Sequence, residues 1–215
     1  MIFVRYEKWN QYLKLYPVTL LIALANIVVF IFMASKGAYG RNGSGQELLQ
    51  YGALSNLTQY PELGHVDGPW RYFSSIFLHG SFEHLLFNCF AILVFLPPLE
   101  RLLGHVRYGL LYLASGIVAN LISMGAYNRL GEYFITVGAS GAIYGGYGAF
   151  LYLALFQRQK MDQASRKTVY LLLATGLVLS FITPNINIWA HLGGLIGGFF
   201  LYGVMVRLPV GRRIG

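Results

Sequence analysis

Six long apolar segments dominate this chain and limit the folds open to it more than any other feature. They lie at about 17–34, 82–99, 107–126, 135–156, 168–182 and 187–206. A helix that spans a bilayer needs about 20 apolar residues, and these segments approach that length. Only 11% of the residues are charged, too few to cover a water-facing surface. We therefore expect an all-α polytopic membrane protein, folded as a six-transmembrane-helix bundle.

The basic residues predict how this bundle is oriented. With the N-terminus in the cytoplasm, twelve of the sixteen Lys and Arg residues fall on the cytoplasmic side. Because cytoplasmic loops carry the excess of these residues, we expect a multi-pass protein of the cell membrane with both termini cytoplasmic. The chain then divides into a leader at 1–16 without a cleavable signal, a membrane domain at 17–206 and a basic tail at 207–215. The net charge of +8 indicates topology and contact with anionic membrane lipid, and nucleic-acid binding is not expected.

One connection between the segments is far longer than the others. Residues 35–81 form a predicted external loop rich in Gly, Tyr and Pro. Long ordered loops tend to be functional. The loop ends in Pro69-Trp70-Arg71-Tyr72-Phe73, whose aromatic and basic side chains are typical of an interfacial anchor. We expect this part to lie partly in the plane of the membrane.

Four polar side chains fall near the outer ends of three predicted spans. Ser140 lies about five residues into the fourth span, and His191 about four residues into the sixth. His84 and Asn88, spaced i and i+4 on one helix face, lie about two and six residues into the second. At 1.5 Å per residue, the expected layer is roughly 6–9 Å below the outer surface. A lone intramembrane histidine often only bonds a neighbouring helix, but four groups at one depth indicate a functional site.

Glycines supply a reason why Ser140 and His191 could meet. Gly138 and Gly141 flank the serine, and small-xxx-small spacings occur at Gly141/Gly145, Gly193/Gly197 and Gly194/Gly198. Such faces let helix backbones approach closely. A serine activated by a histidine must lie within about 3 Å of the ring nitrogen. Packing alone would also explain the glycines, and the two explanations are compatible.

Taken together, these residues resemble the motifs of the rhomboid family of intramembrane serine proteases. The similarity covers roughly residues 17–206. It rests on Trp70-Arg71, His84-x-x-x-Asn88, Glu100 with Gly104, Gly138-x-Ser140 and His191-x-x-Gly194. A Gly-x-Ser-Gly sequence alone is a weak signal, whereas all the motifs in order and in matching spans are a strong one. The resemblance implies the bacterial six-span form of the fold, with an active site near the external face.

The resemblance also implies a serine endopeptidase that works with a catalytic dyad. Ser140 would be the nucleophile and His191 the general base, and Tyr144 would pack against the histidine ring. The sequence agrees in offering no Asp or Glu in the middle of a span as a third member. The remaining site residues implied are His84, Asn88 and the backbone N–H of Ser140 as oxyanion donors, with Gly138 and Gly141 in support. No metal and no cofactor are expected.

The expected substrates are single-span or polytopic membrane proteins. Their transmembrane helices would enter from lipid between the second and fifth spans and unwind near their outer ends, because a helical peptide bond is hidden by its own hydrogen bonds. Two other readings remain open. The chain could be an inactive rhomboid-like module that binds transmembrane helices, although such relatives typically lack the serine or the histidine. It could also be a proton-coupled transporter, which would often show an internal repeat and a polar layer at the midplane.

Three further residues have expected roles outside the dyad. Cys89 lies in an apolar stretch and is expected to pack as a small residue. His79, just before the second span, could support the site by hydrogen bonding. Glu100 lies at the cytoplasmic end of the second span, where we expect it to tie a loop to a helix.

Overall fold

A computed structural model describes residues 2–4, 6–38, 45–58 and 66–208. Of the expected basic tail at 207–215, only the first two residues therefore lie within the described part. The long helices in chain order are α2 (Pro17–Ser35), α5 (Phe82–Phe95), α7 (His105–Leu130), α8 (Ser140–Phe156), α9 (Gln163–Ile182) and α10 (Ile188–Met205). The shorter elements are α1 (Trp9–Leu15), α3 (Gly45–Gln50), β1 (Leu54–Ser55), α4 (Arg71–Ser74), η2 (Ser75–Phe77), α6 (Pro97–Leu103), β2 (Ile135–Thr136) and η3 (Arg158–Lys160).

The long helices match the six apolar segments expected from the sequence. By length and composition, α2, α7, α9 and α10 can each cross a membrane. Helix α5 has 14 residues and passes the same test together with residues 71–77, which lie at 91° to it. Helix α8 is apolar but has only 17 residues, which corresponds to about 26 Å of helix against a hydrocarbon core of about 30 Å. The chain is an all-helical polytopic membrane protein.

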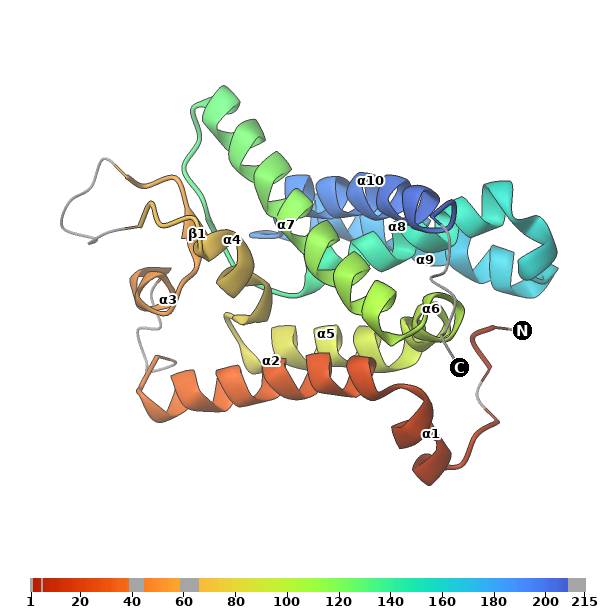
Figure 1. Cartoon of the computed structure of the whole chain (residues 1–215). Coiled ribbons are helices and arrows are strands. Elements are labelled where there is room, and N and C mark those ends of the chain that lie inside the picture. The colour runs from red at the N-terminus through yellow and green to blue at the C-terminus, as the bar shows by residue number, and fades with distance from the viewer. Residues whose placement is uncertain (1, 5, 39–44, 59–65, 209–215) are drawn as a thin grey trace.

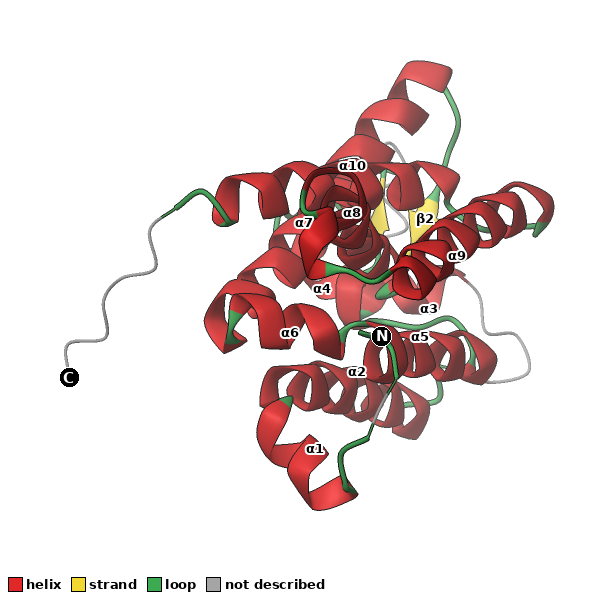
Figure 2. Cartoon of the chain, turned by 90° about the vertical axis from the view of Figure 1, so that its right-hand side faces the viewer, coloured by secondary structure: helices red, strands yellow, loops and turns green. Residues whose placement is uncertain are grey.

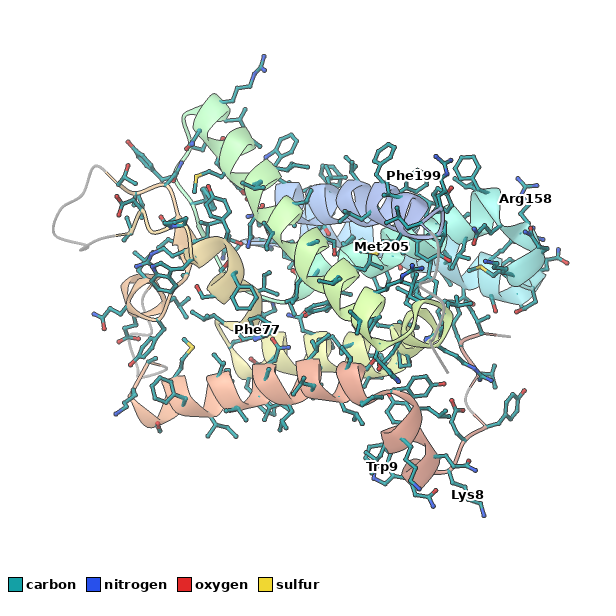
Figure 3. All side chains as sticks on the ribbon, in the orientation of Figure 1. Lys8, Trp9, Phe77, Arg158, Phe199 and Met205 are labelled. Atoms are coloured by element: carbon teal, nitrogen blue, oxygen red, sulfur yellow. The ribbon has the colours of Figure 1, made fainter. Side chains whose placement is uncertain are left out.

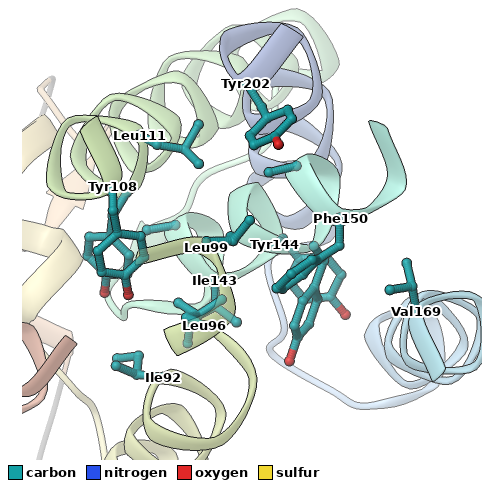
Figure 4. Packing of buried hydrophobic residues seen from close by; sticks show 14 of the residues in the cluster. Ile92, Leu96, Leu99, Tyr108, Leu111, Ile143, Tyr144, Phe150, Val169 and Tyr202 are labelled. Carbon is teal, nitrogen blue, oxygen red and sulfur yellow. The ribbon is translucent and has the colours of Figure 1, made fainter. Parts of the chain in front are cut away.

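Helix α8 forms the centre of the bundle. It packs against α10 and α7, with α9 alongside (Figure 2). Every residue from 141 to 150 is buried. The core around it is built from aliphatic and aromatic side chains of several helices, including Leu96, Leu111, Ile143 and Phe150 (Figure 4). Burial of large apolar side chains on every side fixes the position of α8.

The two ends of the bundle differ in what they carry. Helix α1, helix α6 and the connection from α8 to α9 lie at one end, and α3, β1 and α4 lie at the other (Figure 1). Lys8, Trp9 and Arg158 project at the first end (Figure 3). Helices α5, α8 and α10 all begin at the end that carries α3 and α4 (Figure 1). Residues near the starts of these three helices are therefore brought to one region.

Glycines make the contact between α8 and α10 very close. A Cβ atom added to Gly194 would collide with the backbone oxygen of Gly141, and one added to Gly198 would collide with that of Gly145. A Cβ atom at Gly148 would likewise strike the backbone of Leu195. The small-xxx-small spacings therefore bring the two helix backbones together, as expected from the sequence.

The expected start of the fourth span is wrong. Residues 135–136 form strand β2, which pairs antiparallel with β1 at Leu54–Ser55, so this part of the chain is extended. Gly138 then adopts φ +119°, a conformation that L side chains rarely adopt and that ends the extended segment. Ser140 is consequently the first residue of α8 and not about five residues inside a helix. The estimated depth of Ser140 below the outer surface assumed five helical residues before it, so that estimate no longer applies.

The second span is also shorter than expected. Its helix ends at Phe95, and a separate helix, α6, begins at Pro97. The ring and the missing N–H of proline disrupt a continuous helix, and Pro97-Pro98 occupies the first turn of α6, where proline is tolerated.

Arg71 is a buried residue that joins parts of the long connection between α2 and α5. Its side chain is 5% exposed, and Nη1 donates to the carbonyl oxygens of Leu49 at 2.6 Å and Ala53 at 2.9 Å. Trp70 beside it is half exposed, and the Arg71 guanidinium lies over its ring. Arg71 is thus a buried residue that stabilises the loop by hydrogen bonds to its backbone, and it is not part of a surface anchor. The segment at 71–77 runs at nearly a right angle to α5, and its expected position along the membrane plane stays a prediction.

Glu100 ties two parts of the opposite end together. Its carboxylate accepts hydrogen bonds from the N–H groups of Val18 and Thr19 in the first turn of α2. It also accepts from the Thr19 hydroxyl and bonds Nδ1 of His105. An acidic group at a helix N-terminus satisfies unpaired amides and the helix dipole. The structural role expected for Glu100 is confirmed.

The first residues of the chain join three helices at this same end. The backbone N–H of Ile2 donates to Ser165 Oγ in the first turn of α9 at 2.9 Å. The ring of Phe3 packs edge-on against Phe95 at the end of α5 and against Phe150 of α8. This short segment therefore links the ends of α5, α8 and α9.

Candidate active site

Ser140 and His191 form a direct hydrogen bond between two helices. Ser140 Oγ lies 2.9 Å from Nε2 of His191, which is in the first turn of α10. The side chain of Asn187 caps that helix by accepting from the N–H of Ala190, so the turn that carries His191 is fixed. Ser140 is partly exposed, whereas His191 is 7% exposed. Residue 140 is therefore more accessible than the imidazole behind it.

Tyr144 fixes the plane of the imidazole. It lies one turn after Ser140 on α8, and its ring stacks on that of His191 with a centroid distance of 4.1 Å and an interplanar angle of 11°. Parallel contact with an aromatic ring restricts rotation of the histidine about its χ2 angle. The packing that the family resemblance implied for Tyr144 is present.

Ser180 contacts the other face of this arrangement, from α9. Its Oγ lies 2.6 Å from Nδ1 of His191 and 3.1 Å from the hydroxyl of Tyr144. The imidazole is therefore bonded at both nitrogens, to Ser140 on one side and to Ser180 on the other. Within the described part of the chain, neither nitrogen is bonded to a carboxylate.

His84 and Asn88 face the turn that leads into Ser140. A Cβ atom placed on Gly138 would lie 2.7 Å from His84 Nε2 and 3.7 Å from Asn88 Nδ2. The turn itself is anchored by a 2.8 Å hydrogen bond from the N–H of Gly138 to the carbonyl oxygen of Ser75. Gly138 thus allows α5 to approach the backbone beside the serine.

Hydrogen-bond donors without partners are gathered at this point. Asn88 is buried, and its Nδ2 has no acceptor within the described part of the chain. Ser140 occupies the first helical position of α8, where a backbone N–H has no acceptor in its own helix. The positive end of the helix dipole adds to this field. The arrangement can therefore stabilise a negative charge that develops next to the serine oxygen.

The other residues considered in the sequence are placed as follows. His79 is buried, and its ring meets that of His84 edge-on with a centroid distance of 5.0 Å. Gly141 lies in the close contact with Gly194, so its role is in packing α8 on α10. Cys89 is buried in α5. Among the described residues, no group of three or more His, Cys, Asp or Glu side chains could hold a metal ion.

Ser180 is the residue of the site that sequence reasoning missed. A serine in an apolar helix is usually explained by a bond to the carbonyl four residues earlier, and Ser180 makes this bond to Gly176 at 2.7 Å. The available signal was the pair Gly176 and Ser180, a small-xxx-small spacing on a third helix. That spacing predicts a close helix contact, but only the fold shows that the contact is with His191 and Tyr144.

Comparison with known proteins agrees with this architecture. The Rhomboid domain family model matches residues 67–208, which is more than half of the chain. The protein named "Putative rhomboid protease YdcA" from Bacillus subtilis (strain 168) is 38% identical over 93% of this chain and 94% of its own length. Rhomboid protease GluP from the same organism is 37% identical over 61% of this chain, and the match spans 25% of its length.

A plant protein extends the comparison. RHOMBOID-like protein 1 of Arabidopsis thaliana is 37% identical over 67% of this chain and 36% of its own length. The match to the bacterial relative of similar size thus covers nearly both chains, and the longer relatives share only part of their length with this one. Together with the fold and the family-model match, these similarities show that the chain belongs to the rhomboid family.

Proposed function

We propose that this chain is an intramembrane serine endopeptidase that hydrolyses peptide bonds in or near transmembrane helices. The single observation that carries the proposal is the 2.9 Å hydrogen bond between Ser140 Oγ and His191 Nε2. Ser140 acts as the nucleophile and His191 as the general base. Distances of this kind between a hydroxyl and a base are what activation of a weak nucleophile requires.

The proposed reaction has two stages. Nε2 of His191 accepts the hydroxyl proton while Ser140 Oγ attacks the scissile carbonyl carbon, and the proton then passes to the leaving amine. Water, activated by the same nitrogen, hydrolyses the acyl-enzyme. The oxyanion of each tetrahedral intermediate is stabilised by Asn88 Nδ2, the His84 ring and the backbone N–H of Ser140. No metal or cofactor enters these steps.

Substrate access is proposed to occur from lipid, between α5 and α9. Much of α9 is exposed, including Leu171, Leu179 and Phe181, so a transmembrane helix can lie against it. The substrates are single-span or polytopic membrane proteins whose helices unwind near the site, because an intact helix hides its peptide bonds. Membrane lipid is the surrounding solvent, and nucleic acid is not a partner.

The orientation in the cell membrane belongs to the same proposal. Both termini are cytoplasmic, the leader at 1–16 and the tail at 207–215 flank a protease domain at 17–206, and the site opens near the external face. The excess of Lys and Arg at the predicted cytoplasmic ends supports this orientation. A site at one face also gives water access that the hydrocarbon core does not provide.

Covalent labelling and cleavage test the proposal together. In detergent micelles, the wild-type protein is incubated with a fluorophosphonate probe and, separately, with a generic single-span substrate whose products are identified by mass spectrometry. Labelling and a defined cut are expected, and both should be lost in Ser140→Ala. Ser115→Ala is the matched control, because Ser115 is a buried helix serine whose hydroxyl bonds its own backbone at Tyr112.

The outcomes separate the proposal from its alternative. If folded wild-type protein binds a transmembrane substrate but neither reacts with the probe nor cleaves, the chain is an inactive module that binds transmembrane helices. If Ser140→Ala still cleaves, the nucleophile is another group. Equal labelling of wild type and Ser140→Ala leads to the same conclusion.

A further inference from the structure

Ser180 Oγ has three polar neighbours and only one proton. It lies 2.7 Å from the carbonyl oxygen of Gly176, 2.6 Å from Nδ1 of His191 and 3.1 Å from the Tyr144 hydroxyl. The carbonyl oxygen can only accept, so the hydroxyl proton of Ser180 satisfies it. The two lone pairs of Ser180 Oγ then accept from Nδ1–H and from the Tyr144 hydroxyl. In this arrangement every hydrogen-bond donor of the cluster has an acceptor.

The proton count determines the tautomer of the histidine. With the proton on Nδ1, the neutral imidazole presents a bare Nε2 to Ser140, as a general base must. The opposite tautomer would carry a proton on Nε2 and could not accept one from the serine. It would also leave Nδ1 to compete with the Gly176 carbonyl for the single proton of Ser180. The protonated imidazolium keeps the same Nδ1–H bond, so no rearrangement is needed during the reaction.

The geometry points to Ser180 as the positioning residue that sets the tautomer and orientation of His191. This inference rests on the proposed dyad and extends it. Ser180 performs for this histidine the part that a buried carboxylate performs in serine proteases with a triad, without bringing a charge into the membrane domain. Ser180 does not touch the substrate and acts only through His191.

The local structure of α9 shows that this contact is more than a serine bonding its own helix. Thr175 makes the same kind of bond, from Oγ1 to the carbonyl oxygen of Leu171 at 2.7 Å, but it is exposed. Ser180 is 4% exposed and meets two groups of other helices. One turn earlier, a Cβ atom at Gly176 would lie 2.6 Å from the Tyr144 hydroxyl, so a side chain there would displace this hydroxyl from its place against α9. Gly176 and Ser180 therefore lie one turn apart on the face of α9 that contacts Tyr144 and His191.

The test compares Ser180→Ala with Ser180→Thr, using Thr175→Val as the matched control that removes a helix-bonded hydroxyl elsewhere on α9. Purified proteins in detergent are assayed for kcat and KM on a single-span substrate and for fluorophosphonate labelling rate. Loss of one orienting hydrogen bond should lower kcat and the labelling rate of Ser180→Ala about tenfold, with KM unchanged. Ser180→Thr, which keeps a hydroxyl, should recover most of the loss, and Thr175→Val should match the wild type.

Nitrogen NMR gives a readout that does not depend on activity. The ¹⁵N-histidine signals of His191 are identified as those missing from His191→Asn. In the wild type they should show a protonated Nδ1 and an unprotonated Nε2, and in Ser180→Ala a mixture of tautomers. An unchanged tautomer in Ser180→Ala, or a kcat within twofold of wild type, would overturn the role of Ser180. Failure of the dyad itself appears differently, as persistent cleavage by Ser140→Ala.

Discussion

Asn88 carries a buried amide nitrogen that has no acceptor within the described part of the chain. A buried polar group left without a hydrogen bond costs about 1–3 kcal/mol of stability. Such a cost is understandable if the donor is used only when charge develops on a reacting oxygen. The position of Nδ2, close to the turn at Gly138 that precedes the serine, fits this use.

Replacement of this amide should therefore damage catalysis more than folding. We expect Asn88→Ala to lower kcat by roughly 10²–10³, as for the loss of one oxyanion donor, with little change in KM. Its thermal unfolding temperature should equal or exceed that of the wild type. Cys89→Ala, the neighbouring buried residue of α5, is the control and should keep full activity. Equal kcat in Asn88→Ala and the wild type would exclude the amide from the oxyanion site.

Single residues differ in how far the sequence reveals them. Ser140, His191, His84 and Asn88 were predicted to share a layer because polar groups are rare and expensive in apolar segments. Ser180 is a buried polar residue of the same site, but its bond to the Gly176 carbonyl already explains why a serine is tolerated in this helix. Its contact with His191 depends on how α9 packs. The sequence therefore reveals polar groups that have no local explanation better than those that have one.

At the scale of elements, the contact between α8 and α10 depends on the absence of side chains. Gly198→Ala would place a methyl group against the backbone of Gly145, so the helices must separate. Overpacking of this kind costs about 1–3 kcal/mol, and thermal unfolding in detergent should show a clear loss. Gly125→Ala in α7 is the control, since nothing lies within 4 Å of its added Cβ atom. If the two variants unfold at the same temperature, the helices do not pack as closely as described.

The cap of α9 gives this helix a dependence on pH. Asp162 accepts hydrogen bonds from the N–H and the hydroxyl of Ser165, which hold the pKa of its carboxyl well below the ordinary value of 3.8. A lowered pKa in the folded state means that the cap contributes fully above the unfolded value and is lost as the carboxyl becomes protonated. The unfolding temperature of the wild type should therefore fall more steeply below about pH 4 than that of Asp162→Asn. Parallel curves would show that the cap has no part in this dependence.

Element boundaries were harder to predict than element existence. All six apolar segments form helices, because each contains enough apolar residues to be buried or to face lipid. The start of α8 was misplaced because residues 135–139 are as apolar as the helix that follows, and composition does not distinguish strand from helix there. The Pro97-Pro98 pair indicates a helix break, but the prediction of a single span at 82–99 continued the helix across it.

At the scale of the whole molecule, the proposed orientation can be tested without reference to catalysis. In a Cys89→Ala background, Lys36→Cys and Lys160→Cys each place one thiol at an exposed position on opposite sides of the proposed topology. A membrane-impermeant maleimide added to intact cells should label the cysteine at 36 and spare that at 160. Permeabilised cells should label both. The reverse pattern would invert the orientation and leave the chemistry of the site unaffected.

The first residues of the chain fix the start of α9. Ile2 bonds Ser165 in its first turn, and Phe3 packs between α5 and α8. Because α9 is held at its first turn and much of it is exposed, we expect it to pivot about that turn when a substrate enters, which moves its far end, where Ser180 lies, the most. Spin labels at Lys167 and at Ile182, each measured to a label at Phe200, should then give a narrow distance distribution for the first and a broad one for the second. If α9 moves in this way to admit a substrate, Ser180 moves away from Nδ1 of His191. The imidazole would then regain its orientation only when α9 returns.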